Sequence, residues 1–504
     1  MENKLRVLGA SCDWTRERFT LDPQIAKINY KVFKKLYDDG LIYRGERIIN
    51  YCPRCGTAFS QLEVNFIERD DPLYFLNYET ISIATTRPET IFADVAIAVN
   101  PKDKKYKNMV GKKAKIPLIN REIPILADSL VDPEFGTGAL KVTPGHDATD
   151  FEIGQRHKLL AISVIDQKGR MINTPEKYIG LRAKEARKRV VEDLEKDGKI
   201  QKIEKLHHTI GVCYRDKGLI EPMLSKQWFI QVQPLAKMAL ESIKKGDIKF
   251  VAKRYEKIAK HWLKNLKDWN ISRQIVWGIR IPAWRCEHCL RWTITEGKSP
   301  QKCPFCGHDR LKQDPDTFDT WFSSGQWPYS VLLAQDRIPN FQFPISNKEN
   351  FRNINYFYPT SIMGTAYDIL PFWVIRMIML GLYTTGKVPF RQVLIHGLVR
   401  DKKGQKISKS KGNVVNPLTM VEKYGADALR MAIVWGALVE NDISLSEENV
   451  RGQRNFANKL WNIARFVFQN KANHQFSNSN FQKRRPRARN EDDKKILKEN
   501  NIDY

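Results

Sequence analysis

The spacing of apolar side chains divides this chain of 504 residues into segments of different character. Apolar residues at helical intervals, closed by a glycine, predict a helix over 24–40. From Leu73 to about Leu140 the chain turns to short apolar runs between prolines, glycines and asparagines, which predicts a mainly β insert. Helical spacing then returns over 182–197 and 235–268.

The last third of the chain predicts a parallel sheet with a helical connection. The strand-like runs YFYPTSIM and QVLIHGLV flank a helical stretch over 368–383. From Ser446 onward the spacing is helical again. These patterns indicate the α/β fold class.

The most apolar window runs from Ser361 to Tyr383 and contains Asp368, Pro371 and Arg376. Two charges and a proline argue against a membrane span, so we expect this window to be buried core. The first residues lack the long apolar stretch of a secretory signal. These features predict a cytoplasmic protein without a membrane partner, in which thiols stay reduced.

Charge and composition narrow the class of partner. The formal net charge is +27, and 42% of the residues are hydrophobic, which excludes a disordered or collagen-like chain. Such an excess of lysine and arginine favours a polyanionic partner, with nucleic acid as the first interpretation. A basic enzyme with a solvated surface is the alternative. The basic run over 483–489 is more typical of a solvated loop than of an RNA contact.

Six of the eight cysteines form three C-x-x-C pairs. Two of these pairs are separated by thirteen residues, and two such knuckles can each offer two thiolates to one tetrahedral Zn²⁺. We therefore predict a structural zinc ribbon with the ligands Cys286, Cys289, Cys303 and Cys306.

The third knuckle, Cys52 and Cys55, has no second pair nearby in the sequence. Its best remote partner is Cys213, and His207, His208 or Asp216 is the candidate fourth ligand. Loss of the metal is the alternative. We expect Cys12 to be an ordinary buried thiol.

The run KISKS at 406–410 follows the predicted strand QVLIHGLV. Two lysines with small hydroxyl residues between them suit a triphosphate, because ammonium groups can follow the charge as the α-phosphate is attacked. A lysine–serine run is not specific by itself, so its neighbours decide its meaning.

With those neighbours, KISKSKGN after IHGLVRD resembles the signature loop of the class I aminoacyl-tRNA synthetases. Further segments, in family order across nearly the whole chain, resemble the valyl-tRNA synthetases among them. These segments are LGASCDWTRERFTLD (8–22), ATTRPET (84–90), VTPGHDATDFEIGQRH (142–157), EPMLSKQWF (221–229), ISRQIVWGIRIPAW (271–284), DTWFSSGQWP (319–328) and NKLWNIARF (458–466).

The resemblance implies a synthetic site that uses ATP with Mg²⁺, valine and tRNA(Val). The catalytic lysines would be Lys406 and Lys409, and the amino-acid pocket would be lined by Trp321, Asp368 and Ile369. Ala366 stands where the family usually has glycine, and its methyl group is expected to crowd a nucleotide lying against the strand end. The implied ATP-binding residues are His396, Gly397, Lys406, Ser408 and Lys409.

The resemblance also implies an editing site in the insert, because a slot sized for valine cannot strongly reject the nearly isosteric threonine. Asp150 would hold the misacylated α-amino group, and Asp147 with Thr143 or Lys141 would recognise the threonine hydroxyl. The implied editing residues are Thr85, Thr86, Arg87, Phe135, Lys141, Thr143, Asp147 and Asp150. No Ser-His-Asp or metal-hydrolase set is visible in the insert, so we expect a positioned water to attack.

One family motif, His-x-Gly-His, is absent from these residues. By resemblance, we expect a fragment that lacks the first catalytic segment and most of the anticodon-binding region, with a separately encoded N-terminal half as a possible partner. The expected parts are the end of the first Rossmann half (1–65), the editing domain (66–215), the return of the insert with the zinc ribbon (216–315), the second Rossmann half (316–445) and the start of a helical anticodon-binding domain (446–504).

Two other functions stay open at the level of the sequence. One is a free-standing hydrolase that edits misacylated tRNA without activating an amino acid. The other is a non-catalytic zinc-ribbon protein that binds RNA, which would leave KISKSKGN unexplained.

Overall fold

The computed structural model describes residues 2–60, 63–336, 352–401, 404–405, 407, 416–435, 437 and 441–471. The chain divides into two compact units. The larger unit spans Trp14–Ile395, and the smaller one combines Met1–Asp13 with the chain from His396 onward. Each unit is described by itself.

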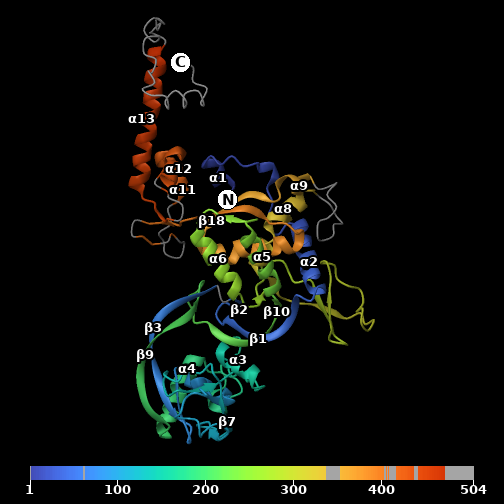
Figure 1. Cartoon of the computed structure of the whole chain (residues 1–504), viewed down its shortest axis with the longest axis vertical. Helices are drawn as coiled ribbons and strands as arrows, with labels where there is room; N and C mark the ends of the chain where they lie inside the picture. Colours follow the sequence, from blue (N-terminus) through green and yellow to red (C-terminus); the bar gives the residue numbers. More distant parts are fainter. Residues whose placement is uncertain are drawn as a thin grey trace. The chain divides into compact units, whose positions relative to one another are not determined.

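The larger unit has its main hydrophobic core between helices and two sheets. The parallel pairing of β11 with β19 lies in the sheet β11-β19-β18, while a second sheet has the order β12-β10-β1-β2. Figure 1 shows α5 and α6 side by side beside this core. The strands are β1 (Ile42–Cys52), β2 (Thr57–Phe59), β10 (Glu221–Ile230), β11 (Lys249–Phe250), β12 (Trp269–Asn270), β18 (Thr360–Ala366) and β19 (Phe390–His396).

Helix α2 (Pro23–Asp38) confirms the helix predicted over 24–40. A proline opens it, and Ile25, Ile28 and Phe33 turn inward at helical spacing. The chain leaves the helix at Gly40, which has a φ of 73°. The other core helices are α5 (Gln233–Lys245), α6 (Lys253–Asn265), α7 (Thr320–Ser324), α8 (Trp327–Asp336), α9 (Arg352–Phe357) and α10 (Ile375–Thr385).

Two predicted helices have a different internal structure. The stretch 235–268 is two helices, because Gly246 takes a left-handed φ of 83° after α5 and β11 follows. The stretch 368–383 begins with a 3₁₀ turn, η5 (Tyr367–Ile369), and a π-helical turn, η6 (Leu370–Val374), before α10. Pro371 has no backbone N–H to donate there, which disfavours a regular α-helix.

Among the described residues, Tyr367–Thr385 is the one helical segment long and apolar enough to cross a membrane. However, 67% of its most apolar window is buried inside the protein. Met379 and Leu380 are fully buried in the main core. The predicted core, Ser361–Tyr383, is therefore confirmed for its helical part, whereas Ile362 in β18, near the start of that window, is half exposed.

The insert has a hydrophobic core of its own. Figure 1 shows β3 (Val64–Asn77) and β9 (Ile200–Cys213) as a long two-stranded ribbon that carries the chain into the insert and back. The predicted short strands are present as β4 (Ser82–Thr85), β5 (Ala96–Val99) and β7 (Glu122–Ala127), and β6 (Lys113–Lys115) and β8 (Ala139–Val142) complete the second sheet. The helices are η3 (Pro88–Ala93), α3 (Ala148–Arg156), η4 (Glu176–Tyr178) and α4 (Ala183–Lys196).

The smaller unit is mainly helical. A core of Ala428, Leu429, Leu445 and Val450 joins its helices. The predicted C-terminal helix is α13, which continues to Lys471; the basic run over 483–489 lies outside the described residues. The unit contains α1 (Glu2–Val7), α11 (Pro417–Tyr424), α12 (Ala426–Val434), α13 (Glu447–Lys471) and the short parallel pair β20 (Val399–Arg400) and β21 (Ile443–Ser444).

Candidate active sites and metal centres

A cleft of about 1640 Å³ is bounded by β4, β8 and the first turn of α3 in the insert, and it extends to residues of β1, β3, β9, β10 and α6. All eight residues predicted for editing line this cleft: Thr85, Thr86, Arg87, Phe135, Lys141, Thr143, Asp147 and Asp150. Phe135 is half exposed at the rim, whereas Lys141 and Thr143 are buried. The cleft thus brings together segments that lie up to 65 positions apart in the sequence.

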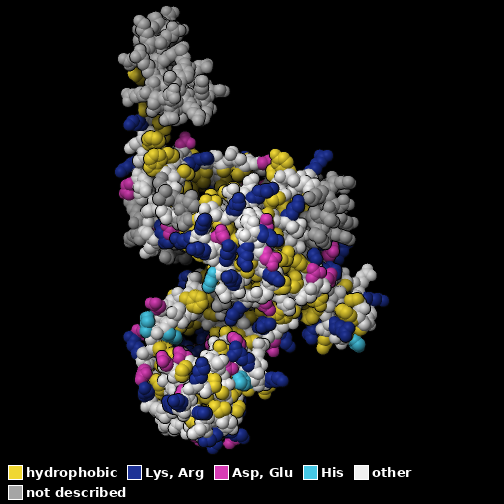
Figure 2. Space-filling model, viewed as in Figure 1, with side chains coloured by type: hydrophobic (Ala, Val, Ile, Leu, Met, Phe, Trp, Pro, Cys, Tyr) yellow, Lys and Arg dark blue, Asp and Glu magenta, His cyan; other side chains and the backbone are white. Residues whose placement is uncertain are grey.

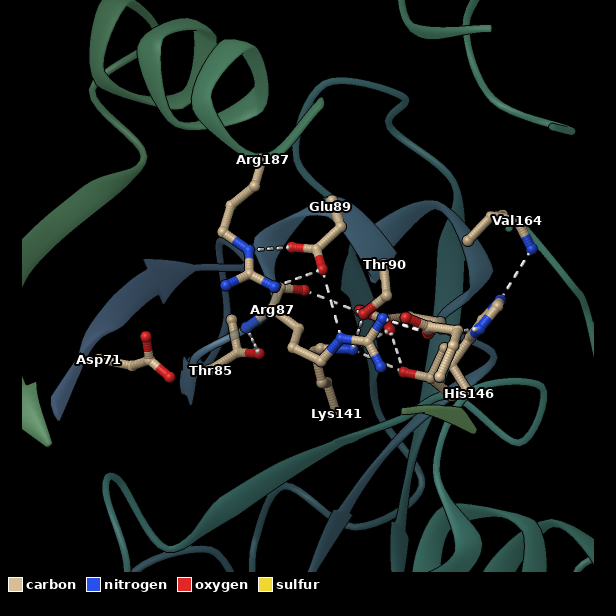
Figure 3. A network of polar contacts seen from close by, with 12 residues as sticks. Asp71, Thr85, Arg87, Glu89, Thr90, Lys141, His146, Val164 and Arg187 are labelled. Carbon is tan, nitrogen blue, oxygen red and sulfur yellow. Dashed lines mark hydrogen bonds and ion pairs between the residues drawn. The ribbon is translucent and has the colours of Figure 1, made fainter. Parts of the chain in front are cut away.

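Lys141 lies at the centre of a polar network in the wall of the cleft (Figure 3). Its Nζ donates to Thr90 Oγ1 at 3.0 Å, to Asp94 Oδ1 at 2.9 Å and to Thr143 Oγ1 at 2.6 Å. An ammonium group has three hydrogens, so these bonds use them all. Lys141 therefore supports the wall and has no further donor for a ligand.

Asp150 accepts a hydrogen bond from the backbone N–H of Thr143 at 2.8 Å. Burial, and after it the nearby charge of Asp147, raises the pKa of Asp150 to about 7. Asp147 caps α3 by accepting from the amides of Thr149 and Asp150 at 2.7 and 3.1 Å. Burial disfavours the charged form of this carboxyl group, and a cation placed beside it would favour the carboxylate again.

Arg87 is held from two sides (Figure 3). Its Nη2 donates to Glu221 Oε1 at 2.5 Å and its Nε to Glu89 Oε1 at 3.2 Å. Burial alone would lower the pKa of Arg87, but the two carboxylates outweigh it and raise that pKa. Glu89 in turn accepts two bonds of 2.8 Å from Arg187 on α4. The cation is therefore fixed rather than free to swing.

The three residues predicted to line the amino-acid pocket lie near one another in the larger unit. Trp321 on α7 stacks on Phe372, with 5.3 Å between ring centroids. Asp368 lines a cavity of about 450 Å³ together with Phe372. Ile369 follows Asp368 in η5. Phe372 thus contacts the tryptophan and borders the cavity that contains the carboxylate.

The motif around Trp321 is fixed by hydrogen bonds. Asp319 caps α7 by accepting from the amide of Trp321 at 3.3 Å, and its other oxygen accepts from the indole of Trp269 at 2.9 Å. Arg273 lies 2.9 Å from the same oxygen of Asp319. These bonds therefore fix the backbone from which the indole of Trp321 extends.

The predicted nucleotide residues belong to the smaller unit, and only two are described. His396 Nδ1 lies 2.8 Å from the carbonyl oxygen of Gly397. A Cβ at position 397 would lie 1.9 Å from the carbonyl oxygen of Asn441, so only glycine fits there. Lys406, Ser408 and Lys409 lie outside the described residues.

Residues 1–446 match the family described as tRNA synthetases class I (I, L, M and V). The chain belongs to the class I tRNA synthetases. This confirms the resemblance and the α/β fold class expected from the sequence.

Curated relatives of this class I synthetase chain bear the name Valine--tRNA ligase. The protein of Geobacter sulfurreducens is 47% identical over 474 residues, which cover 93% of this chain and 52% of that protein. The protein of Carboxydothermus hydrogenoformans is 48% identical over 473 residues, with the same two coverages. The chain thus spans about half the length of the curated relatives it matches. A solved Agrobacterium radiobacter LeuRS complex with tRNA and LeuAMS has a TM-score of 0.49 and 18% identity, and covers 94% of this chain and 64% of that one.

The synthetase chain brings four cysteines together in the ribbon formed by β14 (Ala283–Cys286), β15 (Trp292–Ile294) and β16 (Leu311–Gln313). The Sγ atoms of Cys286 and Cys306 are 3.6 Å apart, as are those of Cys289 and Cys303. Ligands at about 2.3 Å in a tetrahedron lie about 3.8 Å from one another. The predicted set of four therefore fits Zn²⁺.

A second set of four joins Cys52 and Cys55 with Cys213 and Asp216. Cys55 Sγ is 3.7 Å from Cys213 Sγ, and Cys52 Sγ is 3.7 Å from both oxygens of Asp216. Of the three candidates for the fourth ligand, the structure brings Asp216 to the cysteines. This set also fits a tetrahedral metal.

The two histidine candidates lie elsewhere. His207 and His208 pair with Asp70 and Asp71 on the β3/β9 ribbon, at 2.8 and 2.9 Å. The interpretation of Cys12 as a buried thiol is wrong, since this residue is exposed in the short segment after α1.

The sequence did not identify several residues that hold the cleft together. His146 accepts from the amide of Val164 through Nε2 at 2.8 Å, and its Nδ1 faces Glu221 at 3.7 Å. The quoted segments ATTRPET, GHDATD and EPMLSKQWF contain four of these residues, but their motifs do not say which side chains point into the site. The missed residues are Glu89, Thr90, Asp94, His146, Arg187 and Glu221.

The excess of positive charge does not gather in one patch on the visible face of the protein. Figure 2 shows lysine and arginine side chains spread over it with acidic side chains among them.

Proposed function

We propose that this chain carries the editing site and part of the synthetic site of a valine–tRNA ligase. Such an enzyme joins valine to tRNA(Val) with ATP, and hydrolyses mischarged threonyl-tRNA(Val). The observation that supports the proposal is that the eight residues selected by resemblance to the family line a single cleft. The names of the relatives, at 47% identity over 93% of the chain, agree with it.

In the editing reaction, water attacks the ester carbonyl, the acyl–oxygen bond breaks, and the products are threonine and the intact tRNA with a free ribose hydroxyl on its terminal adenosine. Asp150 would pair with the α-ammonium group of threonine, which fixes the ester in the cleft. Thr86 and Arg87 would position the terminal adenosine and the attacking water. Asp147 and Thr143 would bind the threonine hydroxyl. Positioning of this kind lowers the barrier without a covalent intermediate.

In the synthetic reaction, Trp321 and Ile369 would border the isopropyl group of valine, and Asp368 would act at the amino acid and nucleotide. His396, Gly397, Lys406, Ser408 and Lys409 would bind ATP with Mg²⁺. Lys406 and Lys409 would follow the charge of the triphosphate as the adenylate forms. The domain boundaries given above and a cytoplasmic location are part of the same proposal.

Zinc would have a structural role. Zn²⁺ on four thiolates, or on three thiolates and a carboxylate, has a closed coordination shell and ties loops together. The first set would be Cys286, Cys289, Cys303 and Cys306, and the second would be Cys52, Cys55, Cys213 and Asp216.

Deacylation of threonyl-tRNA(Val) by the purified chain tests the editing assignment. The wild-type chain should release threonine, and Asp150→Ala should abolish the release. Asp197→Ala, which changes an exposed aspartate of the same insert, is the matched control and should keep the wild-type rate. Unchanged activity in Asp150→Ala would refute the assignment of the pocket.

Valine-dependent ATP–pyrophosphate exchange separates the alternatives. A ligase should show exchange when a segment carrying His-x-Gly-His is supplied, whereas a free-standing editing hydrolase should show deacylation and no exchange under any condition. A non-catalytic RNA-binding protein should bind tRNA and show neither reaction.

A further inference from the structure

Asp94 is fully buried behind the wall of the cleft, directly after η3. Its Oδ1 accepts from Lys141 at 2.9 Å and from the hydroxyl of Thr143 at 2.7 Å. Its Oδ2 accepts from the hydroxyl of Tyr78 at 2.6 Å. Asp94 itself is not among the residues that line the cleft, but both of its Oδ1 partners are.

These bonds determine the direction of the Thr143 hydroxyl. A hydroxyl has one hydrogen and two lone pairs, and a carboxylate only accepts. The hydrogen of Thr143 therefore points to Asp94. One lone pair accepts from Lys141 at 2.6 Å, so one lone pair is left. Thr143 can only accept a further hydrogen bond and cannot donate one.

We propose that Asp94 is the positioning residue that makes the editing cleft select a substrate with a side-chain hydroxyl. This inference rests on the proposed editing function. The hydroxyl of a bound threonine can donate to the remaining lone pair of Thr143. Valine places a methyl group there, so the second lone pair of the Thr143 oxygen, which threonine would fill, loses its donor.

Without Asp94, the Thr143 hydroxyl can rotate and donate its hydrogen bond to another acceptor. The acceptor then no longer requires a donor from the substrate, and discrimination between threonine and valine falls. An unpaired buried polar group changes an equilibrium by about tenfold or more, so the change is measurable as a ratio of rates.

Single-turnover deacylation of threonyl-tRNA(Val) and valyl-tRNA(Val) by the full chain tests the proposal. Asp94→Ala should lower the threonyl-to-valyl rate ratio by about tenfold or more. Asp94→Asn should keep the ratio, because its amide oxygen can face Lys141 and Thr143 while its amino group faces Tyr78. Tyr78→Phe removes only the bond on the far side of Asp94 and should also keep the ratio.

Two outcomes would overturn the proposal. One is an unchanged ratio in Asp94→Ala, and the other is an equal loss of both rates, which would indicate a general structural role. If Asp94→Ala does not fold, Asp94→Leu combined with Lys141→Met removes both charges together, and its ratio should fall below that of Lys141→Met alone. If the wild-type chain deacylates neither substrate, the editing function itself is refuted, which is a different result.

Discussion

The backbone amide of Thr143 donates to Oδ2 of Asp150 at 2.8 Å, which ties the first turn of α3 to the end of β8. Asp150 thereby becomes a buried carboxylate in a wall of the cleft rather than a solvated residue of a helix N-terminus. Its location determines both how it can bind a substrate and how much its charge lowers the free energy of unfolding.

Editing activity should depend on pH through Asp150. The proposed ion pair with an α-ammonium group needs the carboxylate form, and burial raises the pKa of Asp150 to about 7. The single-turnover deacylation rate should rise with pH and level off above about 7. Asp197→Asn, which changes an exposed aspartate of the same insert that does not line the cleft, should keep this profile. A wild-type rate that is flat between pH 5.5 and 8.5 would contradict the assignment.

The same carboxylate should reduce stability at neutral and alkaline pH. In the unfolded chain an aspartate titrates near pH 3.9, whereas in the fold the pKa of Asp150 is about 7. The unfolded state therefore loses its proton first as the pH rises, and stability falls between those two values.

Asp150→Asn should consequently be more stable than the wild type at pH 8, by up to about 4 kcal/mol, and equal to it near pH 3. The asparagine oxygen can still accept from the Thr143 amide. Urea unfolding at the two pH values measures the difference. Equal stability at pH 8 would show that burial does not penalise this charge.

Loss of Glu89 should unfold the insert more readily than loss of other acidic residues. Glu89 is fully buried and pairs with both Arg87 and Arg187, so Glu89→Ala removes this carboxylate from two partly buried cations and leaves Arg87 only its pair with Glu221. Breaking such a pair costs about 3–5 kcal/mol.

The change should appear as a lower urea midpoint for Glu89→Ala. Glu122→Ala is the control, because Glu122 pairs with Lys113 at the surface and its removal should leave the midpoint in place. Similar midpoints for the two variants would argue against a supporting role for the Arg87–Glu89–Arg187 cluster.

The chain should bind two zinc ions, one in each set of four ligands. Elemental analysis of the purified chain should give about two zinc ions for each polypeptide. Cys286→Ser and Asp216→Ala should each lower the content by about one, and Asp216→Cys should keep both ions, since a thiolate can replace the carboxylate. Zinc content that does not respond to Asp216→Ala would remove Asp216 from the second site.

Local features of the chain could be predicted because their causes are local. Helix α2 has its proline, its inward apolar residues and its final glycine within one stretch of sequence. The four cysteines of the predicted zinc ribbon also lie in one short segment, so spacing alone identified the set: Cys286, Cys289, Cys303 and Cys306. Six of the eight cleft residues lie in the family segments ATTRPET and VTPGHDATDFEIGQRH, and Phe135 and Lys141 lie between these two segments, so the resemblance could select all eight.

The second set of metal ligands depended on tertiary structure. The β3/β9 register places Val64 opposite Cys213, which returns the chain to the knuckle of Cys52 and Cys55. The same register places His207 opposite Asp70, away from that knuckle. No spacing rule could choose Asp216 over the histidines, because the choice follows from strand pairing across a long insert.

The polarity of the cleft also depended on tertiary structure. The family resemblance identified Lys141 and Thr143. It did not show that the hydroxyl hydrogen of Thr143 is donated to Asp94 or that Glu221 holds Arg87. The sequence determined the local elements and the candidate residues of each site, because periodicity and motifs depend on residues that are near one another in the chain. Only the fold decided which hydrogen-bonding groups are left for a ligand, because burial and pairing depend on neighbours that are remote in the chain.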